Sequence, residues 1–114
     1  GFGVSLCGVH TTSPHRPNDP REWRSQLAAI AAHARTATCT LVVAGDFDAS
    51  WRHLPLRVSP LRAPRSFWTP TWPARLPLLE LDHVLVARGQ VSSTYFSLPG
   101  SDHLGVLATI TPSQ

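Results

Sequence analysis

The sequence predicts an α/β fold, and three observations support this prediction. An alternating run over residues 2–10 ends at Val9-His10, a helical pattern follows, and a continuous apolar run, TLVVAGDF, covers residues 40–47. Strand, helix and strand in this order form a βαβ unit, whose crossover is almost always right-handed. We therefore expect two parallel strands that bring His10 and Asp46 to the same edge of the sheet.

The helix is predicted to begin at Pro20 and to end near Arg35. Asp19 is suited to the N-cap, Pro20 fits the first helical position, and Glu22 follows Asp19 at the spacing of a capping box. Apolar side chains recur on one face, at Trp23, Leu27, Ile30, Ala31 and Ala34. This face is expected to pack against the sheet.

The second half of the sequence predicts an irregular segment and three closing strands. Residues 51–77 are rich in proline, tryptophan and arginine, which is typical of an irregular and often functional segment. The runs LLELDHVLVA, VSSTYFSL and LGVLATIT then read as strands that are antiparallel neighbours.

Composition narrows the function classes only slightly. The 114 residues carry 42% hydrophobic residues, enough for one globular domain, and the longest apolar stretches are shorter than the roughly 20 residues of a membrane span. The formal charge of +3 weakly favours polyanionic partners such as nucleic acid. Five arginines fall in a segment without acidic residues: Arg52, Arg57, Arg62, Arg65 and Arg75.

The two cysteines are expected to remain free thiols. Cys7 lies three residues before His10, whereas Cys39 lies seven before Asp46. In parallel strands with level ends the two sulfurs would be roughly 13 Å apart, too far for a disulfide.

Two motifs carry the residues that are suited to chemistry. In GDFDAS, the carboxylates of Asp46 and Asp48 alternate along the backbone and offer the oxygen ligands that Mg²⁺ prefers. An Asx-turn that closes a strand is the structural alternative for this motif. In SDHLGV, Asp102 adjoins His103, whose imidazole would serve as a base if a carboxylate such as Asp82 held its other ring nitrogen. A turn histidine bonded to a backbone carbonyl is the alternative for His103.

The motifs VHTTSP, GDFDAS, LDHVLV and SDHLGV resemble, in their order and spacing, those of the endonuclease/exonuclease/phosphatase superfamily, the metal-dependent phosphodiesterases related to deoxyribonuclease I. The resemblance implies that residues 1–114 form a single partial domain, the C-terminal half of a four-layer α/β sandwich, with one mixed sheet that the helix covers on one side. The sheet face opposite the helix, which the other half would cover, should then be an exposed apolar patch.

The resemblance also implies roles for individual residues. His10 would contact the scissile phosphate, Asp82 would orient His103, and Asp102 would lie in the metal or nucleophile shell. Asp46 and Asp48 would hold Mg²⁺, with Mn²⁺ as an alternative, together with the attacking water. The implied activity is hydrolysis of a phosphodiester or phosphomonoester by attack of water, assisted by the metal and the His-Asp pair.

Asp48 departs from the family pattern, which usually has Asn at this position, and no residues match the family's N-terminal Glu and Asn. A second hypothesis is therefore a non-catalytic half-domain that binds phosphate-rich ligands or a complementing N-terminal half. A calcineurin-like di-metal phosphatase is a third. The resemblance leaves open DNA, RNA, inositol phosphates and lipid headgroups as substrates, and a cytoplasmic protein or one anchored upstream in a membrane. Three further residues are proposed to contact substrate: His53, Arg57 and Trp72.

Overall fold

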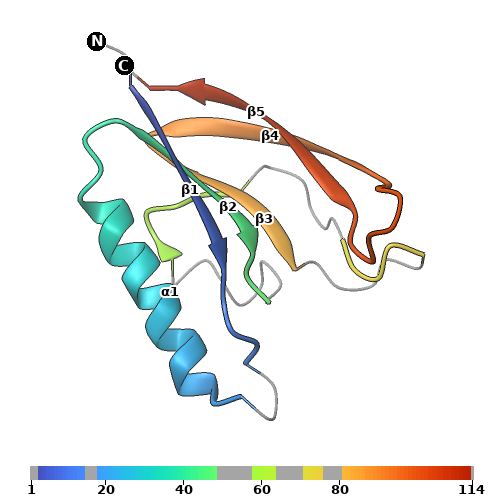
Figure 1. Cartoon of the computed structure of the whole chain (residues 1–114). Helices are drawn as coiled ribbons and strands as arrows, with labels where there is room; N and C mark the ends of the chain where they lie inside the picture. The colour runs from blue at the N-terminus through green and yellow to red at the C-terminus, as the bar shows by residue number, and fades with distance from the viewer. Residues whose placement is uncertain (1–2, 15–17, 49–57, 64–70, 76–80, 114) are drawn as a thin grey trace.

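The computed structural model describes residues 3–14, 18–48, 58–63, 71–75 and 81–113. These residues form three layers, a helix, a three-stranded sheet and a two-stranded ribbon. A single helix, α1 (Pro20–Arg35), covers one side of a three-stranded sheet formed by β1 (Val4–His10), β2 (Thr40–Asp46) and β3 (Asp82–Ala87). A two-stranded ribbon, β4 (Gly89–Phe96) and β5 (Gly105–Pro112), forms the layer on the other side (Figure 1).

The predicted βαβ unit is present, and its helix has the expected bounds. β1 and β2 are parallel, and β3 runs antiparallel to β2, so the sheet is mixed. Asp19 caps α1 by accepting a hydrogen bond from the backbone N–H of Arg21 at 2.8 Å. The sheet order β1-β2-β3 places β2 in the centre, which explains why its first four residues are buried.

The main core lies between α1 and the sheet. Leu27 of the helix and Leu41, Val43 and Leu85 of the sheet are each at most 2% exposed. Trp23 joins this core, and its indole N–H donates to the carbonyl of Phe47 at 2.9 Å. Complete burial of one such aliphatic side chain contributes about 1.5–3 kcal/mol to folding. The packing fixes α1 against the two strands whose ends carry His10 and Asp46.

The expectation of one sheet is wrong, because the chain leaves the sheet at the end of β3. Arg88 has a φ of 59°, and β4 begins at the next residue and pairs only with β5 among the described strands. A side chain at Gly89 would meet the carbonyl oxygen of Thr111 at 2.8 Å, so the ribbon requires glycine here. Thr40 ties the ribbon to β2, since its hydroxyl donates to the carbonyl of Arg88 at 2.6 Å. Of the three closing strands predicted to be antiparallel neighbours, β4 and β5 do pair in this way, whereas β3 pairs with β2 and not with β4.

The sheet face opposite α1 is only partly covered. Leu6, Val42 and Val86 are aligned across β1, β2 and β3, yet their exposed fractions are 77%, 4% and 1%. Val4 on the same face of β1 is also exposed. The expected exposed apolar patch is therefore present on β1, whereas the equivalent parts of β2 and β3 are buried.

Cys7 and Cys39 are free, as predicted, although both are half-buried. Cys7 is the register partner of Val43, so the four-residue offset from Cys39 is confirmed. Among the described residues, no helix combines the length and the apolar character needed to cross a membrane.

Candidate functional site

Three of the predicted site residues lie in register at one edge of the sheet. His10, Asp46 and Asp82 are aligned across β1, β2 and β3, so their side chains are on the same face, away from α1. Gly45 permits this alignment, since its φ is 148° and a side chain there would overlap the carbonyl oxygen of Val9. The βαβ unit and β3 together thus bring two carboxylates and an imidazole to one edge of the sheet.

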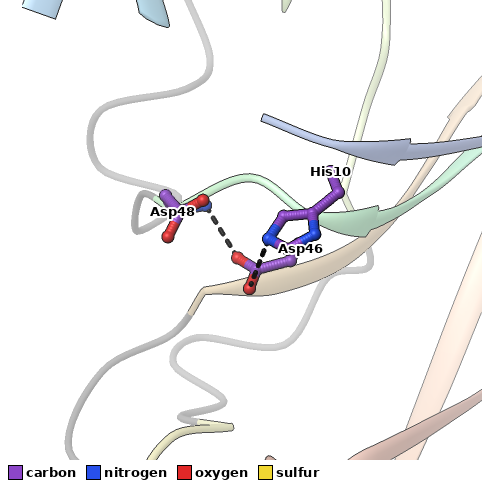
Figure 2. Close-up of side chains that lie close together, drawn as sticks. All are labelled: His10, Asp46 and Asp48. Atoms are coloured by element: carbon purple, nitrogen blue, oxygen red, sulfur yellow. Dashed lines mark hydrogen bonds and ion pairs between the residues drawn. The ribbon is translucent and has the colours of Figure 1, made fainter. Parts of the chain in front are cut away.

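The two carboxylate oxygens of Asp46 have different surroundings. Oδ1 accepts a hydrogen bond from the backbone N–H of Asp48 at 2.9 Å, which is the Asx-turn that the sequence left as an alternative. Oδ2 lies 3.7 Å from His10 Nε2 and 3.9 Å from His103 Nε2. Figure 2 shows His10, Asp46 and Asp48 gathered where β1 and β2 end. Asp46 therefore closes the strand with one oxygen and faces the site with the other.

His103 is held by Asp82, as predicted. Its Nδ1 lies 2.6 Å from Asp82 Oδ2, and because an ionised carboxylate only accepts hydrogen bonds, Nδ1 carries the proton. In the neutral ring Nε2 is then unprotonated, and it faces Asp46. Burial lowers the pKa of His103, but the hydrogen bond to Asp82 and the charges of Asp82, Asp46 and Asp102 outweigh it, so the pKa lies above its ordinary value.

Thr71 supports this pair and was missed in the sequence. Its fully buried hydroxyl donates to Asp82 Oδ2 at 2.7 Å and accepts from the backbone N–H groups of Leu81 and Asp82 at 3.2 Å each. Threonine in a proline-rich segment carries no signal of such a contact, because the segment is placed by long-range packing. The result is a hydrogen-bonded series from Thr71 through Asp82 to His103.

Asp102 and Trp72 lie on the exposed side of His103. Asp102 Oδ1 is 4.0 Å from His103 Nε2, while Oδ2 accepts a hydrogen bond from the indole N–H of Trp72 at 3.2 Å. The Trp72 and His103 rings are tilted by 50°, with centroids 6.3 Å apart. Trp72, predicted to contact substrate, is thus beside the site.

Asp48 completes a group of side chains that is suited to a divalent cation. Burial is the main cause that raises the pKa of its carboxyl group, and the charge of Asp46 raises it further. One ligand atom each from His10, Asp46 and Asp48 lie within 4.8 Å of one another, as do one each from Asp46, Asp82 and His103. Crowded carboxylate oxygens fit Mg²⁺ or Mn²⁺, whose charge would offset their repulsion. In the part of the chain described, Asp102 belongs to neither group.

Two further histidines lie away from the site, and two predicted substrate contacts lie outside the described segments. His83 points to the helix side of the sheet, where it is 5% exposed and packs edge-on against Phe47. His33 is exposed on α1. His53 and Arg57, the two other predicted substrate contacts, lie outside the described residues.

Comparison with solved structures shows the fold. A crystal structure of β toxin 275–280 from Staphylococcus aureus matches with a TM-score of 0.66 at 15% sequence identity. The match covers 97% of this chain and 53% of that chain, so the chain spans about half the length of this structural relative. No curated protein matches the sequence.

A comparison with models of protein families shows which family the chain belongs to. The model of the Endonuclease/Exonuclease/phosphatase family matches residues 1–103, a range that includes every candidate side chain described above. The match gives no support to the calcineurin-like alternative. The chain therefore belongs to the Endonuclease/Exonuclease/phosphatase family, a family of phosphoesterases.

Proposed function

We propose that this site hydrolyses a phosphodiester or phosphomonoester by attack of water, with a divalent cation and the His103–Asp82 pair. The observation that carries the proposal is the 2.6 Å contact between His103 Nδ1 and Asp82 Oδ2. It leaves Nε2 of the neutral ring free to take a proton beside the carboxylates of Asp46 and Asp48. An imidazole held this way by a carboxylate is a typical general base.

Each side chain of the site would have its own role in the proposed hydrolysis. His103 Nε2 takes a proton from the attacking water as the new P–O bond forms and the bond to the leaving oxygen breaks. The imidazolium is stabilised by Asp82, in keeping with the raised pKa of His103. His10, which is 77% exposed and lies beside Asp46, would donate to a phosphate oxygen. Asp46 and Asp48 would hold Mg²⁺, which would neutralise charge on the phosphate and polarise the water.

Hydrolysis of bis(p-nitrophenyl) phosphate and of plasmid DNA tests this proposal. We expect turnover that requires Mg²⁺, is abolished by EDTA and falls about 10²–10⁴-fold in His103→Ala, which is the usual contribution of a general base. His33→Ala is the matched control, since His33 is exposed on α1. Equal activity in both variants, or activity that survives EDTA, would contradict the proposal.

The exposed face of β1 favours a second candidate, a half-domain that binds without turnover. Leu6 is 77% exposed next to the buried Val42, and the chain spans about half of its structural relative. A complementing N-terminal half would cover this face and supply the family's N-terminal Glu and Asn, which no residue of this sequence matches. Under this candidate the folded chain binds Mg²⁺ or inorganic phosphate in calorimetry but leaves both substrates intact. Turnover by the chain alone would exclude it.

A further inference from the structure

The segment that carries Trp72 is joined to the loop that carries His103 by two backbone hydrogen bonds. The N–H of Leu104 donates to the carbonyl of Thr71 at 2.7 Å, and the N–H of Ala74 donates to the carbonyl of Asp102 at 2.7 Å. Trp72 lies between these two points along the chain, so its backbone position is set relative to Asp102. Thr71 in turn is fixed by its hydrogen bond to Asp82.

The carboxylate of Asp102 links Trp72 to His103. Oδ2 accepts the indole N–H at 3.2 Å, and Oδ1 lies 4.0 Å from His103 Nε2. The Asp102 side chain is 79% exposed, so little else restricts its rotation. An indole N–H is only a donor, and an ionised carboxylate is only an acceptor, so the contact keeps one carboxylate oxygen of Asp102 against the indole.

We propose that Trp72 is a positioning residue, whose indole N–H holds the Asp102 carboxylate beside His103 Nε2. This role differs from a substrate contact, which would need the aromatic ring and not its N–H. The effect on turnover rests on the proposed phosphoesterase function, whereas the effect on the structure of the site does not.

Three substitutions separate the N–H from the ring. Trp72→Phe keeps an aromatic ring and removes the donor, Trp72→Leu removes both, and Asp102→Ala removes the acceptor. In ¹H-¹⁵N spectra of the labelled chain, we expect Asp102→Ala to move the indole signal that disappears in Trp72→Phe. The indole signal of Trp23, which is bonded to the Phe47 carbonyl, should stay in place and serves as the control.

The NMR signals of the His103 imidazole show whether the position of Asp102 affects His103. These signals are identified by their loss in His103→Ala. Trp72→Phe and Asp102→Ala are expected to shift them in the same direction, and the double variant should shift them no further than Asp102→Ala alone. Unchanged His103 signals in Trp72→Phe, or shifts that simply add in the double variant, would overturn the proposal.

If the chain hydrolyses the test substrates, kcat and KM give a second measurement of the role of Trp72. Trp72→Phe should lower kcat by about 2- to 10-fold, the equivalent of one hydrogen bond, and leave KM within about twofold. A raised KM in Trp72→Leu with normal kcat in Trp72→Phe would instead show a substrate contact and refute the positioning role. If the wild-type chain is inactive, the proposed function fails, and the spectra still decide the role of Trp72.

Discussion

At the level of single residues, the site depends on side chains that each serve structure and chemistry together. Asp46 uses one oxygen for an Asx-turn and the other for the site, and Asp82 accepts hydrogen bonds from both Thr71 and His103 on one oxygen. Such sharing means that a change at a supporting residue alters both stability and the reactive imidazole.

Thr71→Val is expected to destabilise the fold by about 1–3 kcal/mol, because it leaves two backbone N–H groups and the Asp82 carboxylate without their partner in a buried position. Thr71→Ser retains the hydroxyl and is the matched control. Urea unfolding followed by tryptophan fluorescence gives both values. Equal stability of the valine and serine variants would show that the hydroxyl contributes nothing.

Asp82→Asn is expected to lower the pKa of His103, because the charge and the hydrogen bond that raise it are removed or weakened while burial remains. Since the pKa of His103 is raised on folding, its contribution to stability is fully present below the unfolded value of about 6.5 and is lost as pH rises through the folded value. This pH-dependent part should shrink or vanish in Asp82→Asn.

NMR titration of His103, together with urea unfolding at about pH 5.5 and about pH 8.5, measures both effects. His33→Ala controls for the loss of an unrelated histidine. A His103 that titrates in Asp82→Asn as it does in the wild type would contradict the role assigned to Asp82.

At the level of secondary structure, the close approach of β1 and β2 aligns His10 with Asp46. Gly45→Ala is expected to destabilise the chain by about 2–3 kcal/mol, because its side chain would overlap the Val9 carbonyl and φ is 148°. Gly8→Ala is the matched control on β1, since a side chain there meets nothing within 4 Å. Urea unfolding should show a large loss for the first variant and almost none for the second; similar losses would refute the argument.

The elements that the sequence predicted well are those specified by local patterns. The βαβ unit was predicted from the capping at Asp19, the helical periodicity from Trp23 and the apolar run of β2. The sequence motifs at the ends of predicted strands indicated the candidate site residues His10, Asp46, Asp82 and His103. Long-range contacts could not be predicted in this way. The turn at Arg88 that starts a second layer depends on Thr40, forty-eight residues away, and Thr71 reaches Asp82 only through tertiary packing.

At the level of the whole molecule, the ribbon of β4 and β5 leaves β1 uncovered. Leu6 on β1 is 77% exposed, whereas the residues aligned with it, Val42 on β2 and Val86 on β3, are 4% and 1% exposed. Leu107 on β5 is also 65% exposed and shares its face with Phe96 of β4, which is 46% exposed, but its direct cross-strand partner is Thr94, and Thr109 follows it on the same face. A few exposed apolar side chains among threonines are normal in soluble proteins, whereas an apolar row that continues a buried surface marks an interface.

The isolated chain is therefore expected to self-associate through β1. Val4→Thr combined with Leu6→Thr should weaken association at least about tenfold, since even one leucine buried in an interface contributes more than 1.4 kcal/mol. Threonine suits a strand, and both positions are exposed, so the fold should retain its stability. Leu107→Thr is the matched control and should associate like the wild type. Sedimentation velocity over a range of concentrations measures the effect. A wild-type chain that stays monomeric throughout, or a control that weakens association equally, would show that the uncovered face of β1 is not the contact surface.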